Sequence, residues 1–177
     1  KPATRRFMPD GTVTFHAHDY VGARMTAKRM RALHFDKQTI KDVSRLVELH
    51  LRFHGYADSP WSDSAVRRYV TDAGPLLARL GCLTRADVTT GNRRKAAMLS
   101  HAYDDLERRI EALREQEELA SIRPELDGQE IMAELGIKPG PEVGKAYKFL
   151  LDLRMERGPI GKELAREALH SWWATQQ

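Results

Sequence analysis

The sequence lacks the features that mark disulfide-stabilised, membrane-spanning and low-complexity proteins. Its one cysteine, Cys82, excludes an internal disulfide framework and is typical of the cytoplasm, where thiols stay reduced. A single cysteine also excludes, within this chain, zinc sites built from four cysteines or from two cysteines and two histidines. No apolar run approaches the roughly 18 residues that a membrane-spanning helix needs, so we expect no membrane partner. Proline-rich, Gln/Asn-rich and collagen-like tracts are absent as well.

Several catalytic signatures are missing too. The sequence contains no G-x-x-x-x-G-K-[ST], no G-x-G-x-x-G after a strand, no G-x-S-x-G and no H-E-x-x-H. No strand-borne pair of carboxylates of the polymerase kind is visible, so this chain alone assembles no two-metal nucleotidyl-transfer site. The chain opens at Lys1-Pro2 without a methionine, and we expect it to begin inside a longer polypeptide.

Charge is distributed unevenly along the 177 residues. The whole chain has 29 Lys and Arg against 25 Asp and Glu, a net charge of +4. Residues 1–95 hold 18 basic and 9 acidic residues, a net charge of +9, whereas residues 96–177 hold 11 and 16, a net charge of −5. Arginine outnumbers lysine by 20 to 9, and its planar guanidinium suits phosphate. This pattern admits a nucleic-acid partner, although an Arg-rich solvated surface explains it equally simply.

Hydrophobic periodicity predicts an all-α fold with a short extended hairpin at the N-terminus, turning at Pro9–Thr12. We expect about eight or nine helices in two packed bundles, with a boundary between a domain of residues 1–118 and a tail of residues 119–177. Asp36 is the expected cap of one helix, and Asp127 with Glu130 forms an expected capping box. The predicted helical segments are 19–34, 36–54, 62–73, 76–81, 84–87, 93–118, 127–136, 141–157 and 161–175.

The histidines form one candidate site. His50 and His54 stand four residues apart on one predicted helix face, and His16 and His18 precede another helix. With the carboxylate of Asp87 they make a borderline set for Zn, Mn, Fe or Ni. Histidines that hydrogen-bond locally are the competing interpretation.

The segment G-I-K-P-G-P-E-V-G, residues 136–144, forms a second candidate. Pro141 suits the first turn of a helix, and Gly140 is expected to adopt a backbone conformation that other residues avoid. The free N–H groups of that turn, with Lys138 and Lys145 alongside, predict a phosphate site. An ordinary helix–helix corner is the alternative.

Basic clusters on helices are the third candidate. Arg24, Lys28 and Arg31 step by four and three residues and form one stripe that could follow a phosphate backbone. Arg67-Arg68 and Arg93–Lys95 are similar clusters, and a solvated face is the alternative for each. We interpret the acidic run of Glu115, Glu117 and Glu118 as solvated.

Two long motifs resemble a known family. Residues 123–132 read R-P-E-L-D-G-Q-E-I-M and residues 135–144 read L-G-I-K-P-G-P-E-V-G. Both resemble the C-terminal region of bacterial CCA-adding enzymes, the class II tRNA nucleotidyltransferases related to poly(A) polymerase. Upstream, residues 15–23 (F-H-A-H-D-Y-V-G-A) and 46–50 (L-V-E-L-H) are similar to the HD-type portion of these enzymes. Lys1-Pro2 is similar to the end of their motif L-L-H-D-x-G-K-P.

The resemblance implies a tRNA-binding body and tail whose parent enzyme adds CCA to tRNA 3′ ends, using CTP, ATP and Mg²⁺. The head motif G-S-x-x-x-R-[DE] and the neck motif R-R-D are absent from this chain, so the resemblance implies no catalytic residues here and no activity for the chain alone. The expected partner is the acceptor stem and T-arm of tRNA. The residues expected near the RNA are Lys138, Gly140, Lys145, Lys148, Arg93 and Arg94.

The same resemblance implies a partial HD metal site. His18, His50 and Asp87 match metal-site positions, His16 and His54 match less well, and Lys1 matches the motif lysine. The central His-Asp doublet is absent, so weak binding of a divalent metal such as Mn²⁺ or Ni²⁺ is expected at most.

Two other functions remain open at this stage. One is an HD-type metal-dependent phosphohydrolase, with the metal activating water. The other is a scaffold that forms a homodimer or supports the head through residues 96–118 and Trp172-Trp173.

Overall fold

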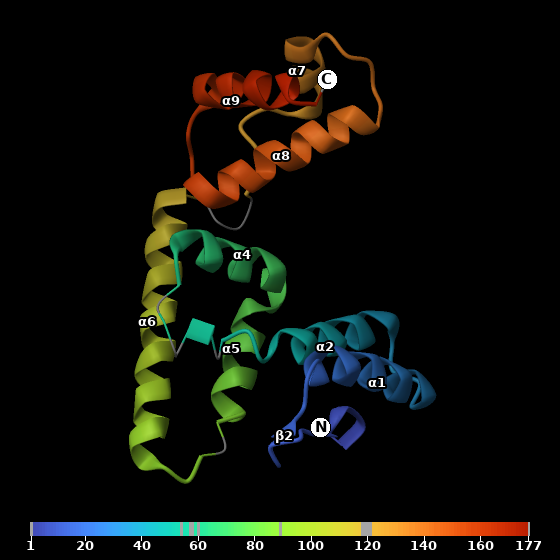
Figure 1. The fold of residues 1–177 in the computed structure, drawn as a ribbon, viewed down its shortest axis with the longest axis vertical. Helices are drawn as coiled ribbons and strands as arrows, with labels where there is room; N and C mark the ends of the chain where they lie inside the picture. The colour runs from blue at the N-terminus through green and yellow to red at the C-terminus, as the bar shows by residue number, and fades with distance from the viewer. Residues whose placement is uncertain are drawn as a thin grey trace. The chain divides into compact units, whose positions relative to one another are not determined.

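The computed structural model describes residues 2–53, 55–56, 59, 61–88, 90–117 and 122–176. This part of the chain holds eight α-helices and two 3-10 helices, η1 (Pro2–Thr4) and η2 (Gly74–Leu76), so the all-α prediction is confirmed, at the lower end of the expected helix count (Figure 1). The α-helices are α1 (His18–Ala32), α2 (Lys37–Leu49), α4 (Asp63–Ala73), α5 (Leu77–Ala86), α6 (Arg93–Glu117), α7 (Gly128–Leu135), α8 (Pro141–Arg157) and α9 (Lys162–Ala174).

The predicted N-terminal hairpin is present. Strands β1 (Arg6–Phe7) and β2 (Val13–Thr14) pair antiparallel, with Phe7 opposite Val13. In the turn, Asp10 Oδ1 accepts hydrogen bonds from the backbone N–H and the hydroxyl of Thr12, at 2.9 and 2.7 Å. An Asp side chain that bonds two residues ahead is a standard turn-forming device.

The chain divides into two compact units. The first consists of Lys1–Pro60 and Asp72–Glu107, and the second of Trp61–Thr71 and Arg108–Gln177. Helices α4 and α6 each contribute residues to both units. The boundary predicted between residues 118 and 119 falls outside the described residues and stays a prediction.

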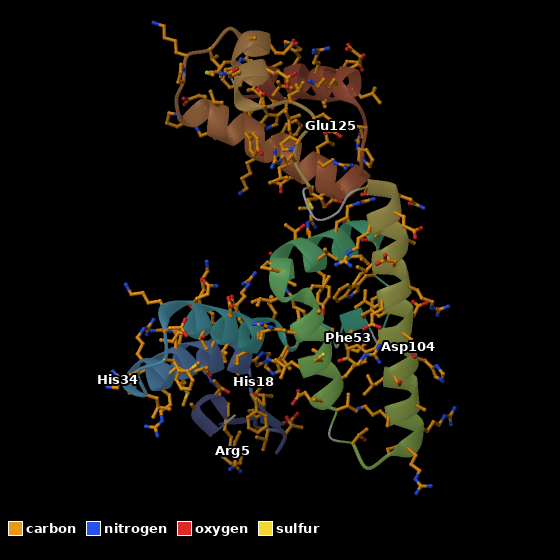
Figure 2. All side chains as sticks on the ribbon, turned by 180° about the vertical axis from the view of Figure 1, so that it is seen from behind. Arg5, His18, His34, Phe53, Asp104 and Glu125 are labelled. Carbon is orange, nitrogen blue, oxygen red and sulfur yellow. The ribbon has the colours of Figure 1, made fainter. Side chains whose placement is uncertain are left out.

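In the first unit, α1 and α2 lie side by side (Figure 1). Gly22 allows the close approach, because a Cβ there would lie 3.4 Å from Val47 Cγ1. Asp36 caps α2 as predicted, accepting the Thr39 N–H at 2.9 Å. The core of this unit includes Phe53, beside α6 in Figure 2, which stacks on Tyr103 with ring centroids 3.5 Å apart.

Helix α5 corrects two predictions. Gly81 was expected to end a short helix before a separate segment at 84–87, but α5 continues through Gly81 to Ala86. A single glycine costs a helix only about 1 kcal/mol, and Leu80 and Thr84 on either side of it are buried. The Thr84 hydroxyl also donates to the Leu80 carbonyl at 2.6 Å, which satisfies it inside the helix.

The C-terminal helices of the second unit follow local sequence rules closely. Asp127 and Glu130 form the predicted capping box at the start of α7, and Gly136 ends that helix in the left-handed region at φ 63°. Helix α8 ends at Gly158, as predicted. The three helices share a core of fully buried side chains: Leu126, Ile131, Ala146, Leu150, Ala165 and Leu169.

The apolar residues of the segment 161–175 predict an inner face made of Leu164, Ala168, Leu169 and Trp172, and the prediction for Leu164 was wrong. Leu164 is 55% exposed, whereas Ala165 is completely buried. Ala165, Leu169 and the partly buried Trp172 repeat at four and three residues, and this stripe leaves Leu164 about 100° to one side.

A buried ion pair joins α4 to α6 within the second unit. Arg67 donates from Nε and Nη2 to the two carboxylate oxygens of Glu117, both at 2.7 Å. Both side chains are only 7% exposed. Arg67 Nη1 also donates to the Met155 carbonyl on α8 at 3.0 Å. The bidentate bonds to Glu117 raise the pKa of Arg67, and burial partly opposes them. Glu117 was expected to be solvated, and Arg67 was expected to contact phosphate or solvent. Both expectations were wrong, because the two side chains are buried against each other.

Gly158 borders this ion pair. Its φ is 76°, and a Cβ there would lie 3.0 Å from Arg67 Nη2 and 3.2 Å from Glu117 Oε1. Glycine is therefore required both by the turn after α8 and by the space that the ion pair fills.

The first prediction compares two neighbouring arginines. Arg67→Met leaves the buried Glu117 carboxylate unpaired and should lower the free energy of unfolding by about 3–5 kcal/mol. Arg68 pairs with Glu156, and their side chains are 49% and 53% exposed, so Arg68→Met should cost about 0–1 kcal/mol. Urea unfolding followed by circular dichroism measures both.

The double variant Arg67→Met/Glu117→Met should recover most of the loss, because no buried charge is left without a partner. Equal losses for the two single arginine variants would contradict the structural role of Arg67.

The second prediction concerns pH. A hydrogen bond from Lys162, helped by the Asp127 N–H, holds the pKa of Glu130 below its usual 4.5. The folded pKa is depressed, so this stabilisation is present above pH 4.5 and is lost as the pH falls through the folded value. Glu130→Gln should therefore destabilise the protein at neutral pH, and the difference from the wild type should shrink in acid.

Thermal unfolding at several pH values measures the difference. Glu167→Gln on the exposed face of α9 removes the same charge without touching a helix cap, so it serves as the control. A deficit of Glu130→Gln that stays constant from neutral to acid pH would refute the linkage.

Candidate nucleic-acid interface

The connection between α7 and α8 exposes the predicted phosphate-binding segment. Lys138, Pro139 and Gly140 are all exposed. Pro141 is the first residue of α8, as expected, and no side chain caps this helix start. Gly140 corrects one expectation, because its backbone is fully extended, with φ 177° and ψ −176°. Any residue adopts that conformation, so backbone geometry does not require glycine here.

The charge at this helix start is mixed. Glu142 lies in the first turn of α8, where a carboxylate already complements the positive end of the helix dipole. Lys145 lies 3.9 Å from Glu142. Lys138 and Lys148 form no ion pair in the described part of the chain. Lys138 and Lys148 are thus the cations of this segment that remain free to meet an anionic partner.

The exposed face of α8 continues the surface. Lys145 and Lys148 are three residues apart and share this face. Gly144 stands on it with open space around it, because an added Cβ would meet no atom within 4 Å. Glycine costs a helix about 1 kcal/mol relative to alanine, and it leaves the helix backbone open to close approach.

Tyr147 was missed by the sequence reasoning. The residue is 36% exposed and precedes Lys148 in the sequence. An aromatic residue out of phase with Ala146 and Leu150, the buried stripe of α8, is the signal that could have revealed it. Exposed aromatic rings among lysines are typical of surfaces that stack on nucleotide bases.

Arg93 and Arg94, the other predicted RNA contacts, begin α6 in the first unit. Both are exposed, and Asn92 caps the helix by accepting the Lys95 N–H at 3.1 Å. The four predicted RNA-binding positions of residues 138–148 lie in the second unit, so the candidate contacts are divided between the units.

Two of the predicted metal ligands meet. The rings of His18 and His50 pack edge to face with centroids 5.8 Å apart. Each Nδ1 lies close to a backbone carbonyl, His18 to Phe15 O at 2.8 Å and His50 to Val47 O at 2.5 Å. His18 Nε2 is buried without a hydrogen-bond partner in the described structure. If each Nδ1 carries the hydrogen, both Nε2 atoms present lone pairs, as in many metal sites.

In the part of the chain that the structure describes, no third ligand joins this pair. Among the described residues, no group of three or more His, Cys, Asp or Glu side chains could hold a metal ion. His16 is exposed, and Asp87 is exposed at the end of α5. His54 and Lys1 lie outside the described residues. The described residues alone thus do not form the predicted metal centre. The part of the prediction that involves His54 and Lys1 is not tested.

Comparisons with known proteins find similarity to enzymes of one kind. No family model matches the sequence, and no solved structure matches it. A CC-adding tRNA nucleotidyltransferase of Thermus thermophilus is 37% identical over 176 residues, which cover 97% of this chain and 37% of the relative. An A-adding tRNA nucleotidyltransferase of Deinococcus radiodurans is 34% identical over 179 residues, covering 99% and 39%. The chain is similar to part of the tRNA nucleotidyltransferases.

The chain thus spans less than two fifths of the length of these relatives. Within the described residues, no helix has the length and apolar character needed to cross a membrane.

The third prediction concerns metal binding. Because two histidines, His18 and His50, are the predicted ligands that meet among the described residues, the chain should retain no stoichiometric Mn²⁺ or Ni²⁺ after dialysis, as measured by elemental analysis. Retention of one equivalent that His50→Ala abolishes, and His170→Ala on α9 does not, would show that a third ligand completes the site.

Proposed function

We propose that this chain is the tRNA-binding part of a bacterial tRNA nucleotidyltransferase. The parent enzyme would add nucleotides to tRNA 3′ ends with CTP or ATP and Mg²⁺, which its other parts would bind. The observation that supports this proposal is the near-complete similarity of the chain to two such enzymes, at 37% and 34% identity.

The two relatives combine a task that they share, binding tRNA, with a task in which they differ, selecting the nucleotide that is added. One enzyme is CC-adding and the other A-adding, so they differ in the nucleotide added and share the tRNA substrate. A region similar to both at almost equal identity is suited to the shared task. We therefore assign RNA binding to this chain and nucleotide selection to the parts that it does not cover.

The exposed face of α8 supplies the chemistry for this role. An RNA duplex hides its major-groove base edges, so recognition there depends on shape, phosphates and 2′-hydroxyl groups. Lys138 and Lys148 can neutralise phosphates, Lys145 can join them by leaving Glu142, and Gly144 lets the backbone of the RNA approach the helix. Arg93 and Arg94 offer further phosphate contacts from the first unit.

The phosphohydrolase alternative has less support. Such a reaction needs a metal-activated water, and the described residues contain a histidine pair but no third ligand. The scaffold alternative predicts no RNA affinity, so the binding experiment below also tests it.

The fourth prediction is measured with a tRNA acceptor–T-arm minihelix across about 50 to 200 mM salt. The wild-type chain should bind it with affinity that falls steeply with salt. Lys138→Gln should weaken binding and reduce the slope of log K against log salt by about one.

Arg157→Gln is the matched control, because Arg157 is also exposed but lies at the other end of α8, about 24 Å from its start. It should leave the salt slope unchanged. Absence of binding by the wild-type chain at low salt would refute the proposed function. Equal effects of the two variants would refute only the assignment of the site.

A further inference from the structure

The outward face of α1 is a second strongly charged surface. The helix packs on α2 through residues around Gly22 and Ala23. Tyr20, Arg24, Lys28 and Arg31 follow each other at intervals of four, four and three residues, and all four are exposed. At 3.6 residues per turn they fall within an arc of about 80°, whose centre lies about 150° around α1 from the point midway between Gly22 and Ala23. We call these four residues the α1 stripe.

The cations of the stripe differ from the arginines of the protein that form ion pairs. Arg45, Arg67, Arg85 and Arg166, for example, each contact a carboxylate. In the described part of the chain, Arg24, Lys28 and Arg31 have no such partner, and α1 carries one acidic residue, Asp19.

Uncompensated like charges at these spacings weaken a helix. Arg24 and Lys28 are four residues apart and Lys28 and Arg31 three, which are the spacings at which helix side chains meet and like charges repel. An anionic partner lying along α1 would remove this repulsion. A continuous stripe of three cations matches a partner whose negative charges repeat along a line, as phosphates do along a nucleic-acid strand.

The stripe also offers apolar surface to a base. A hollow in the surface is lined by Arg24, Lys28 and Arg31 together with Val21, Met25 and Ala27. Tyr20 is 55% exposed and Met25 57% exposed. The guanidinium of Arg24 lies 6.0 Å from the centre of the Tyr20 ring, within the range of a cation–π contact. An aromatic ring beside cations suits a stacked nucleotide base better than it suits an acidic protein surface.

We propose that the α1 stripe is a second RNA-binding surface, located in the first unit. Arg24, Lys28 and Arg31 bind consecutive phosphates of one RNA strand, and the Tyr20 ring stacks on an unpaired base at the end of that strand. The identity of the RNA as tRNA rests on the proposed function, whereas the RNA-binding chemistry of the stripe does not.

The test uses the whole chain and two triple variants that each remove three positive charges. The stripe variant is Arg24→Gln/Lys28→Gln/Arg31→Gln. The control is Arg29→Gln/Lys37→Gln/Lys41→Gln, which changes exposed cations of α1 and α2 that lie off the stripe; Arg29 is about 140° from Arg24 around α1. Circular dichroism confirms that both variants fold.

The stripe variant should bind the tRNA minihelix at least about tenfold more weakly at low salt, with a salt slope smaller by about three. The control should change affinity less than about threefold. Tyr20→Ala should weaken binding to a minihelix with an unpaired 3′ tail more than to a blunt one, and Tyr20→Phe should restore it.

Equal losses in the two triple variants, or none in the stripe variant, would overturn the inference. So would a stripe variant that loses binding to anionic lipid vesicles and keeps its affinity for RNA. If Lys138→Gln weakens tRNA binding and the stripe variant does not, the proposed function stands and this inference fails. If the chain binds an unrelated RNA hairpin through the stripe but does not bind a tRNA minihelix, this inference stands and the proposed function fails.

Discussion

The buried contact between Arg67 and Glu117 ties three helices of the second unit together, because Arg67 lies on α4, Glu117 on α6, and Arg67 also reaches α8. A guanidinium and a carboxylate, each only 7% exposed, are tolerable because two parallel hydrogen bonds join them. The remaining donor of Arg67 reaches the last turn of α8 at Met155. A second, partly buried pair extends this arrangement: Arg154 lies 3.8 Å from Glu125, and Glu125 accepts the backbone N–H of Ile160 at 3.1 Å. The C-terminal end of α8 is therefore held by charge.

The N-terminal end of α8 takes no part in these ion pairs and is exposed. The middle of the helix is fixed by Ala146 and Leu150 in the apolar core, and its end is held by the guanidinium and carboxylate groups. Its first turns carry an exposed face with Lys145 and Lys148. A binding surface on a rigid helix loses little conformational entropy when a partner binds. The stability of the second unit and the proposed RNA contact thus depend on opposite ends of one helix.

Local features of this fold were predictable from the sequence, and long-range ones were not. Asp36, the Asp127–Glu130 capping box and Gly136 were predicted correctly because each depends on residues within four positions. Arg67 and Glu117 are 50 residues apart, and nothing in either local sequence distinguishes a buried charge from a solvated one. The predictions of a helix end at Gly81 and of a buried Leu164 were wrong for a related reason. The burial of Leu80 and Thr84 carries the helix past Gly81, and the burial of Ala165 leaves Leu164 exposed. At the candidate site, the sequence indicated the α8 segment, but the contact of Lys145 with Glu142 and the exposure of Tyr147 required the fold.

Arginine content alone was therefore ambiguous, and pairing resolves part of the ambiguity. An arginine that contacts a carboxylate, such as Arg67 or Arg85, contributes to the fold, and the carboxylate neutralises the charge that a partner would meet. Arg24 and Arg31 repel their own neighbours on α1, so their charge favours an external anion over the isolated chain. The net charge of +4 consequently understates the local attraction of the α1 stripe for an anionic partner, because it averages neutralised internal pairs with a local group of three positive charges. Affinity for an anionic strand depends on that local density, since counterions are released only where phosphates and cations meet.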